Sequence, residues 1–431
     1  MTPARAATTE RRRFPQRAFG SRVGDYELVA KVASGGMASV YLAFPRGAKR
    51  LEDRVAIKIL HHHWAEDPEL VRAFFEEFRI AQLVNHEHVV PVIASGLSDG
   101  RPYLVMQYVE GDTLADRWTA SADGGAILPP SIGLRVVIDM LLGLHAAHET
   151  RDAKGQPLGL VHRDVSPQNT LIGVDGVARL IDFGLARVHR DDPSVTFGTK
   201  GKLAYIAPEE VTGEAPIDRR ADVFASGIVL WEVLTGRRLF RAVNDAATLD
   251  RVVSSVIEHP ERFVTGLHPG VGDICLRALA RAPSQRIGTA LHLAEMLEAA
   301  GSTTPIASHV EVARYMWESI GQRVTQERLI AEHWLRDAGG RAAPEVRHGT
   351  ITASRQRQSS IGGWIRSRPT AVGLMLLVLV ALVIAACAAT TLLRWADQIE
   401  VHLRRAELGD LVGPARLRVR IIETTAQVIG R

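Results

Sequence analysis

The stretch from His162 to Gly184 restricts the fold of this chain more than any other part of the sequence. It reads His-Arg-Asp-Val-Ser-Pro-Gln-Asn, then two short apolar runs around a turn at Asp175-Gly176, and then Asp-Phe-Gly. The two runs predict a β-hairpin, which brings the carboxylates of Asp164 and Asp182 and the carboxamide of Asn169 to one place. One carboxylate can orient the proton of an attacking hydroxyl, while the other carboxylate and the amide hold magnesium on a triphosphate. Each aspartate alone would be an ordinary surface charge, but the combination points to phosphoryl transfer.

The order H-R-D, four residues, N, then D-F-G is similar to the catalytic and magnesium loops of protein kinases. From about residue 25 to 300 the chain resembles the eukaryotic-like (Hanks-type) serine/threonine protein kinases of bacteria. The form HRDVSPQN, with Lys-Gly-Lys-x-x-Tyr further on, is similar to a myxobacterial-type subset. The resemblance implies an α+β, bilobal fold with a small β-rich N-lobe and a large helical C-lobe. It also implies ATP and Mg²⁺ as cofactors, Asp164 as the catalytic base, and Asn169 and Asp182 as the magnesium ligands.

A segment of small residues at 33–40 looks like the glycine-rich loop that covers ATP phosphates. Small side chains let backbone N–H groups approach phosphates closely. The segment departs from the family pattern, since alanine stands at the first and third glycine positions. By resemblance the nucleotide-binding residues here are Ala33, Gly35, Gly36 and Val40.

Two further charged residues fit the same site. Val-Ala-Ile-Lys at 55–58 reads as a strand that aims Lys58 at the phosphates. The periodicity of residues 70–84 predicts a helix, on which Glu77 stands where kinases place the glutamate that pairs with this lysine. Glu76 competes for that role, but the spacing to the Asn-His that ends the helix favours Glu77. The resemblance therefore adds Lys58 and Glu77 to the catalytic set.

The adenine site is implied by the resemblance alone. Residues 89–93 and 102–106 read as the next two strands, which makes Met106 the residue before the hinge at 107–111. The Gln107 carbonyl and the Val109 N–H are expected to meet the edge of the base. The faces of the base are expected to contact the following side chains: Val40, Ala56 and Leu171.

The segment from 182 to 209 corresponds to the activation loop, with Ser194, Thr196 and Thr199 as candidate phosphorylation sites. Most serine/threonine kinases carry a lysine two residues after the catalytic aspartate, where this chain has Ser166. Lys200 or Lys202 could replace that charge. Either Thr199 keeps a substrate-facing role across an insertion, or Lys202 takes that place; spacing slightly favours Lys202.

Other landmarks of the large lobe are in order. Helices are predicted from 131 to 149 and from 222 to 234, the second opening with Asp222, which is expected to hold the catalytic-loop backbone. Glu209 and Arg286 match a structural ion pair. The histidines at 61–63 read as a solvated turn rather than a metal site.

The ends of the chain lie outside this resemblance. Residues 1–24 are arginine-rich and read as a basic, disordered arm, whereas 301–337 read as a helical extension and 338–368 as a linker. Residues 369–393 carry no charge, and about 36 Å of helix would cross a hydrocarbon core of roughly 30 Å, which predicts one transmembrane helix. The remaining residues, 394–431, are then a short extracytoplasmic tail.

Composition adds few constraints. The net charge of +4 is spread along 431 residues, so no nucleic-acid partner is expected. The two cysteines, Cys275 and Cys387, are not expected to pair, because Cys387 lies in the apolar run.

These observations predict a single-pass kinase of the bacterial plasma membrane, with its catalytic domain in the cytoplasm where ATP is found. Its expected partners are protein substrates, ATP, the membrane and, through the kinase domain or the tail, a second copy. Two rival hypotheses remain. A pseudokinase scaffold is suggested by the altered glycine loop and Ser166, and a small-molecule kinase is opposed by the long activation segment.

Overall fold

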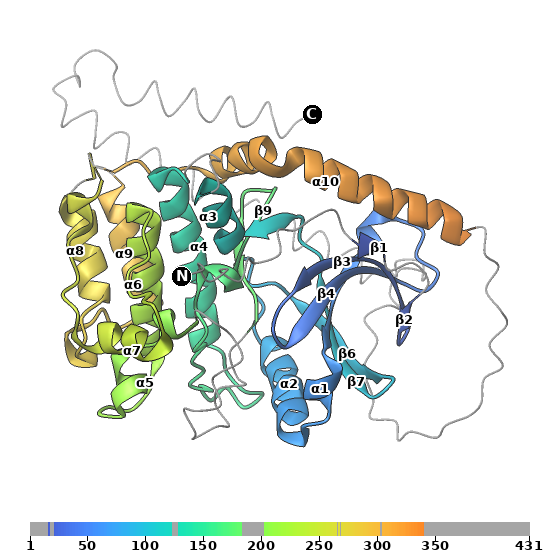
Figure 1. The fold of residues 1–431 in the computed structure, drawn as a ribbon, viewed down its shortest axis with the longest axis horizontal. Coiled ribbons are helices and arrows are strands. Elements are labelled where there is room, and N and C mark those ends of the chain that lie inside the picture. Colours follow the sequence, from blue (N-terminus) through green and yellow to red (C-terminus); the bar gives the residue numbers. More distant parts are fainter. Residues whose placement is uncertain are drawn as a thin grey trace, which may run out of the picture. The chain divides into compact units, whose positions relative to one another are not determined.

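The computed structural model describes residues 16–17, 21–122, 128–182, 202–264, 266–267, 269–301 and 304–339. These residues form a small lobe built on an antiparallel sheet, a large helical lobe, and a long C-terminal helix (Figure 1). The segments predicted as transmembrane helix and tail lie outside the described residues, as do the predicted linker after residue 339 and the activation segment from 183 to 201.

The small lobe is organised around one curved sheet. Its strands run in the order β1-β3-β4-β5-β7-β6, with β2 beside β3. Apolar side chains on one face form a core cluster that includes Leu28, Ile57 and Val105. The bounds are β1 (Gln16–Arg17), β2 (Arg22–Val23), β3 (Tyr26–Ser34), β4 (Ala38–Pro45), β5 (Val55–Leu60), β6 (Val92–Ser98) and β7 (Arg101–Gln107).

Helix α2 (Pro68–Ala81) covers this sheet and positions Glu77. Asp67 caps it by accepting hydrogen bonds from the backbone N–H groups of Glu69 and Leu70, at 2.9 and 3.3 Å. The buried residues recur at helical spacing, and Glu77 is the one carboxylate in an otherwise apolar stripe. The predicted helix is thus present, although it ends at Ala81 instead of continuing to 84.

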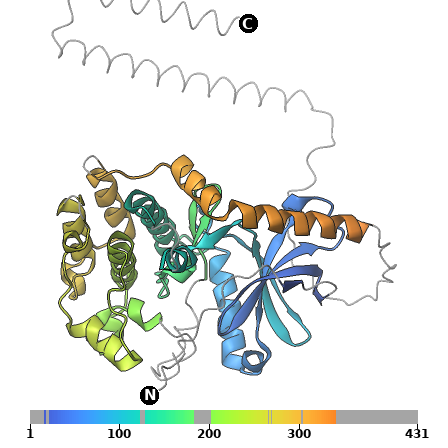
Figure 2. The ribbon, with the colours of Figure 1, turned by 45° about the horizontal axis from the view of Figure 1, so that its top comes forward.

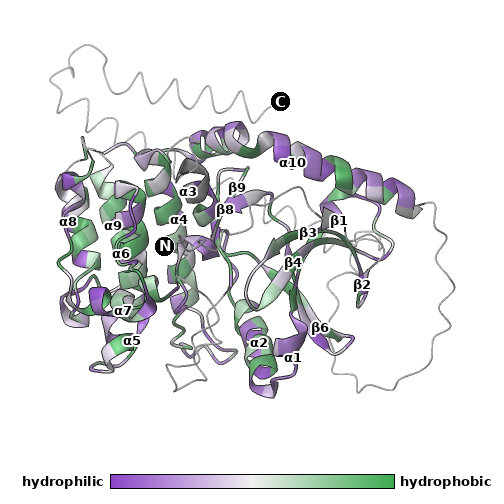
Figure 3. Ribbon diagram, viewed as in Figure 1, coloured by the Kyte–Doolittle hydropathy of each residue, from purple (hydrophilic) through white to green (hydrophobic). Residues whose placement is uncertain are grey.

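The large lobe is built around two buried helices, α4 (Pro130–His148) and α6 (Arg219–Thr235), which are largely apolar (Figure 3). Among the described residues, α4 is the one helix long and apolar enough to span a membrane, yet two thirds of its apolar stretch is buried, so it serves as a core helix. The remaining helices of this lobe are α3 (Leu114–Ala122), α5 (Pro208–Thr212), α7 (Asp245–Ser254), α8 (Pro269–Ala278) and α9 (Ala290–Ala300).

The predicted hairpin forms the centre of a second, small sheet. Strand β9 (Thr170–Gly173) pairs with β10 (Ala178–Leu180) on one side and with β8 (Gly111–Thr113) on the other. The first turn of this region is the short 3₁₀ helix η2 (Pro167–Asn169), which leads directly into β9. The catalytic loop and the Asp182 loop therefore flank one hairpin, as expected.

Helix α10 (His309–Gly339) lies across both lobes (Figure 2). Ser308 and Glu311 form a capping box at its start, with Ser308 N to Glu311 Oε2 at 2.7 Å and Glu311 N to Ser308 Oγ at 3.3 Å. In its first half, Val312, Met316, Ile320 and Val324 join the core of the large lobe. In its second half, Ala331 and Trp334 pack against β3 and β4.

Three local expectations need correction. Residues 89–91 do not continue strand β6, because Val89 and Val90 instead contact Leu180 next to the catalytic hairpin. The histidine run opens a short helix, α1 (His62–Ala65), rather than a turn. Within the segment expected to be an irregular arm, β1 and β2 pair with β3, so the sheet begins before residue 25.

Candidate active site

Lys58, Glu77 and Asp182 meet in the space between the lobes. Lys58 lies on β5, between β4 and β7, and its Nζ is 3.4 Å from Glu77 Oε1 and 2.8 Å from Asp182 Oδ1. The side chains of Lys58 and Glu77 are 14% and 11% exposed, so the lysine shares its charge between two carboxylates away from bulk water. Glu76 instead pairs with Arg79 on the outer face of α2, which favours Glu77 as the partner of Lys58.

The protonation of this cluster follows from burial and proximity. Burial opposes the charge of Lys58, but the adjacent Asp182 and Glu77 carboxylates outweigh it and raise the pKa of the ammonium. Burial raises the pKa of Glu77, and Lys58 offsets this only in part. For Asp182, burial is the largest single effect and opposes ionisation, but the charge and hydrogen bond of Lys58, together with Lys202 and His162, outweigh it and lower the pKa of the carboxyl. Asp182 is therefore the anionic partner of Lys58.

The catalytic loop brings Asp164 and Asn169 together. Asn169 Nδ2 donates to the backbone oxygen of Asp164 at 2.8 Å and to its Oδ2 at 2.7 Å. The carbonyl of Asn169 accepts a hydrogen bond from Ile181 N at 3.0 Å, which joins this loop to the residue before Asp182. With its amide nitrogen engaged, Asn169 leaves Oδ1 for a cation.

A buried aspartate fixes the backbone of this loop. Asp222 Oδ1 accepts from Arg163 N at 2.8 Å, and its Oδ2 accepts from His162 N at 2.7 Å and lies 2.7 Å from His148 Nε2. Both Arg163 and Asp182 adopt positive φ angles, 59° and 56°, which non-glycine residues rarely do. Asp222 thus has the structural role that the sequence suggested.

The predicted adenine-contacting side chains gather in one apolar cluster. Ala56, Val90 and Met106 form its buried part, and partly buried side chains pack against them. Those packed residues include Val40, Val109 and Leu171. Gln107, the last residue of β7, is exposed beside this cluster, and Ala33 pairs with Val40 in the ladder between β3 and β4.

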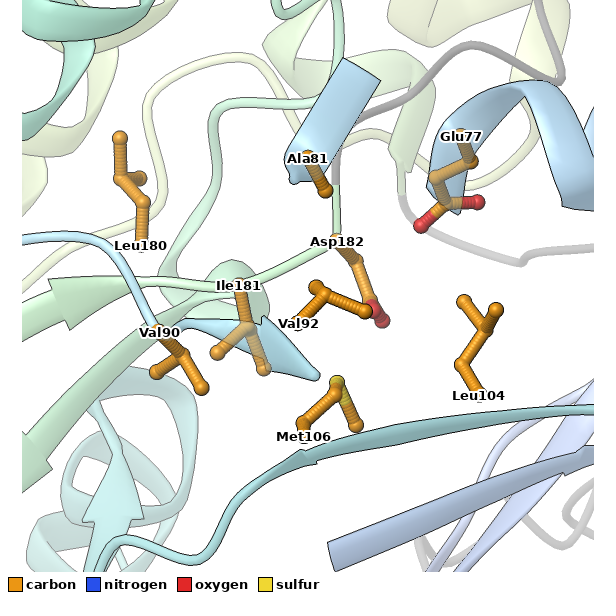
Figure 4. Close-up of a pocket in the computed structure, with 9 residues that line it drawn as sticks. All are labelled: Glu77, Ala81, Val90, Val92, Leu104, Met106, Leu180, Ile181 and Asp182. Carbon is orange, nitrogen blue, oxygen red and sulfur yellow. The ribbon is translucent and has the colours of Figure 1, made fainter. Parts of the chain in front are cut away.

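A pocket continues behind Met106. In Figure 4 the carboxylates of Glu77 and Asp182 point toward the same space, with Leu104 and Met106 at its floor. Its remaining lining is apolar: Ala81, Val90, Val92, Leu180 and Ile181. Two carboxyl groups therefore sit at the polar end of a small, mostly apolar pocket.

The glycine-rich loop has supports that the sequence did not reveal. Gly35 N donates to Ala38 O at 2.9 Å, which closes the turn between β3 and β4. Trp64 Nε1 donates to Gly36 O at 3.2 Å, and His61 lies within hydrogen-bond distance of Gly36 O and Ser39 Oγ. Helix α1 thus holds this loop from the side, through residues whose local sequence carries no nucleotide-binding pattern.

The hinge also has partners far away in the sequence. Arg328 contacts Glu110 through two hydrogen bonds of 2.7 and 2.5 Å, and Tyr108 Oη donates to Glu327 Oε2 at 3.1 Å. Arg323 reaches Gly111 O at 3.2 Å and also contacts the buried Asp112. Helix α10 therefore covers the hinge with cations, which no motif in either segment could indicate.

The end of the activation segment is described from Lys202 onward. Lys202 begins the 3₁₀ helix η5 (Lys202–Tyr205), and its Nζ contacts Asp164 Oδ2. Arg286 and Glu209 form the expected buried pair, at 2.7 and 2.9 Å. The candidate phosphorylation sites, Ser194, Thr196 and Thr199, lie outside the described residues, as does Lys200.

Comparison with known proteins agrees with this geometry. Residues 26–298 match the protein kinase domain family. Tyrosine-protein kinase MasK of Myxococcus xanthus is 37% identical over 276 residues, covering 64% of this chain and 43% of that protein. Serine/threonine-protein kinase PknB of Mycobacterium leprae is 32% identical, with coverages of 66% and 44%. Serine/threonine-protein kinase PrkC of Bacillus subtilis is 30% identical, with coverages of 76% and 48%.

The chain thus spans less than half the length of these three relatives. Among solved structures, the kinase domain of Mycobacterium tuberculosis PknI superposes with a TM-score of 0.51 at 28% identity, covering 66% of this chain and all of that domain. Two of these relatives are named serine/threonine-protein kinases, and the third is named a tyrosine-protein kinase. By the extent of the match and the fold, this chain belongs to the protein kinase domain family.

Proposed function

We propose that this chain is an Mg-ATP-dependent kinase that phosphorylates serine or threonine hydroxyls of proteins, of the myxobacterial-type subset with HRDVSPQN. One observation carries the proposal: Lys58, Glu77 and Asp182 converge beside the apolar cluster around Met106, next to Asp164 and Asn169. An ammonium, a base and two oxygen donors for magnesium are the parts that phosphoryl transfer requires.

The proposed mechanism assigns one task to each side chain. Magnesium, when bound, would neutralise phosphate charge, and the hard oxygen atoms of Asn169 and Asp182 suit it. Lys58, oriented by Glu77, binds phosphate oxygens. Asp164 Oδ1 accepts the proton of the substrate hydroxyl while the hydroxyl oxygen forms a bond to the γ-phosphorus of ATP. The bond between that phosphorus and the bridging oxygen breaks, and the electron pair of this bond leaves with ADP.

The test is transfer of labelled phosphate from ATP by the full-length chain and by Asp164→Asn. Loss of the base should reduce the rate by about 10²–10⁴-fold. Asp250→Asn is the matched control, because it makes the same chemical change at an exposed position of α7. Equal rates for Asp164→Asn and the wild type would refute the role of Asp164.

The pseudokinase hypothesis is tested in the same assay. Nucleotide binding without phosphate transfer, with partner proteins supplied, would favour the scaffold.

The acceptor hydroxyl is a separate question, because the relative MasK is named a tyrosine-protein kinase. Phosphoamino-acid analysis of the product decides it, and we expect phosphoserine or phosphothreonine.

Activation-loop regulation and membrane anchoring are part of the proposal. A phosphosite map after incubation with ATP should show modification at one or more of three residues: Ser194, Thr196 and Thr199.

The uncharged run 369–393 supports a single membrane span, with the catalytic domain in the cytoplasm. Replacing Val380 and Val383 by arginine should release the chain from membranes, since each charge costs about 3 kcal/mol at a helix centre.

A further inference from the structure

The position two residues after Asp164 cannot supply a cation. Ser166 is neutral and 1% exposed, and its Oγ has no hydrogen-bond partner among the described residues. The backbone of Ser166 is fixed as well, since its carbonyl accepts from Asn169 N and from Thr170 Oγ1, both at 3.1 Å. This side chain therefore faces the interior of the large lobe, and not the place where phosphate would lie.

An ammonium does reach Asp164, but it comes from a residue 38 positions later. Lys202 Nζ contacts Asp164 Oδ2, the same oxygen to which Asn169 donates. No hydrogen bond from the described residues engages Asp164 Oδ1, which is left for an incoming hydroxyl. The side chain of Lys202 is 23% exposed, so it can touch Asp164 and still face the cleft.

The turn that carries Lys202 is held firmly. Tyr205, three residues further on, is 7% exposed and donates to Glu232 Oε2 at 2.7 Å. Arg238 binds the same carboxylate at 2.9 Å, and Leu239 N donates to its other oxygen at 3.0 Å. Because Glu232 belongs to the buried helix α6, η5 is anchored to the core, and the contact between Lys202 and Asp164 is not that of a freely moving surface lysine.

We propose that Lys202 is a catalytic residue that replaces the missing catalytic-loop lysine. This inference rests on the proposed kinase function. While Asp164 Oδ1 takes the hydroxyl proton, the Lys202 ammonium contacts an oxygen of the γ-phosphoryl group as this group passes from ATP to the substrate oxygen and ADP leaves. It thereby balances the negative charge that Asp164 and the phosphoryl group bring together. The competing interpretation is that Lys202 inhibits the enzyme by blocking Asp164, as a latch. It predicts that removing the lysine raises the rate of transfer.

The test measures initial rates of phosphate transfer to myelin basic protein by the full-length chain, alongside Lys202→Met and Lys202→Arg. Loss of a charge-stabilising contact should lower kcat by about 10²-fold. The KM for ATP should stay within about twofold, because the interaction is made mainly in the transition state. Arginine should recover part of the rate by keeping the positive charge. Thermal unfolding of each variant separates this effect from a loss of folded protein.

Two lysine variants serve as comparisons. Lys154→Met changes an exposed lysine in the loop after α4 and should keep the wild-type rate. Lys200→Met tests the neighbouring lysine, and a loss confined to that variant would overturn the assignment. A kcat for folded Lys202→Met equal to the wild type would also overturn it, and a raised kcat would identify a latch. A wild-type chain with no transferase activity would instead contradict the proposed function itself.

Discussion

At the scale of single residues, the catalytic loop is held by two buried side chains, the carboxyl group of Asp222 and the imidazole of His162. Asp222 is 1% exposed, and although burial opposes its charge, the hydrogen bonds it accepts from His148 and from the loop backbone lower the pKa of its carboxyl. His162 is equally buried, and burial lowers its pKa although Asp222 and Asp164 are nearby. The loop is thus built around a carboxylate that stays ionised and an imidazole that stays neutral.

This pattern predicts how stability depends on pH. The unfolded chain binds a proton at residue 162 near pH 6.5, and the folded chain binds it only at lower pH. The folded state therefore becomes less stable relative to the unfolded state as pH falls below about 6.5. The stabilising contribution is complete above that value. Urea unfolding at pH 7.5 and 5.5 should show a smaller difference for His162→Gln than for the wild type.

A matched comparison isolates His162. His292→Gln removes an exposed histidine from α9 and should retain the wild-type pH dependence. Asp182 and Asp222, whose pKa values are lowered, affect stability only at more acidic pH. An identical pH dependence in His162→Gln and the wild type would contradict the prediction.

At the scale of elements, α10 connects parts of the molecule that the sheet and the large-lobe helices leave separate. Its first half contributes to the large core, and its second half stacks Trp334 on Phe44, with ring centroids 4.9 Å apart and an angle of 4° between the planes. Between these halves it binds Glu110 and Asp112 of the hinge region. One helix therefore contacts both lobes and the segment that joins them.

Trp334→Ala should destabilise the folded chain by about 3–5 kcal/mol, because it removes a buried ring from a packed cluster. Trp317→Ala is the control, since it changes the same residue type on the same helix at a position that is 39% exposed. Urea unfolding of both variants measures the effect. A similar small loss in both would mean that the stacking on Phe44 contributes little.

Arg323→Ala should weaken nucleotide binding by about tenfold, or ~1.4 kcal/mol, because Gly111 and the buried Asp112 lose a cation that holds the hinge. Titration of the full-length chain with a fluorescent ATP analogue gives the dissociation constant. Arg314→Ala, on the exposed side of α10, should bind as the wild type does. Unchanged nucleotide affinity in folded Arg323→Ala would show that this contact of α10 does not contribute to nucleotide binding.

At the scale of the whole molecule, local sequence explains the site better than it explains the connections between distant parts. The catalytic hairpin, the strand with Lys58 and the helix with Glu77 follow from short patterns, and their meeting was implied by resemblance. Spacing favoured Lys202 only slightly over Thr199, and no local pattern predicts the contact of Lys202 with Asp164, since it depends on how η5 is anchored by Tyr205.

The misplaced elements have physical reasons as well. The apolar run at 89–93 has strand composition, but Val90 N donates to Leu180 O in the other lobe, so tertiary pairing delays the start of β6. The ion pairs of α10 with the hinge join residues more than 200 positions apart, for example Arg328 and Glu110 at a separation of 218. Charges on a surface helix do not reveal such partners.

Removing α10 should therefore damage the catalytic body. A chain that ends at residue 300 lacks the apolar residues that α10 adds to the large core, and it leaves Glu110 without Arg328. We expect a lower melting temperature and binding of a hydrophobic dye, whereas a chain that ends at 339 should melt as the full-length protein does. Equal melting of the two shortened chains would show that α10 is dispensable for stability.

The path of α10 also decides where the polypeptide leaves the catalytic body. The family match stops at residue 298, in the large lobe, but the last described residue is Gly339, beyond Trp334 and beside the small lobe. If residues 369–393 anchor the chain, the tether is attached to the lobe that carries Lys58 and Glu77. Restricting the movement of this lobe at the bilayer would then affect the distance from Lys58 and Glu77 to Asp164. It would thereby affect the geometry of phosphoryl transfer.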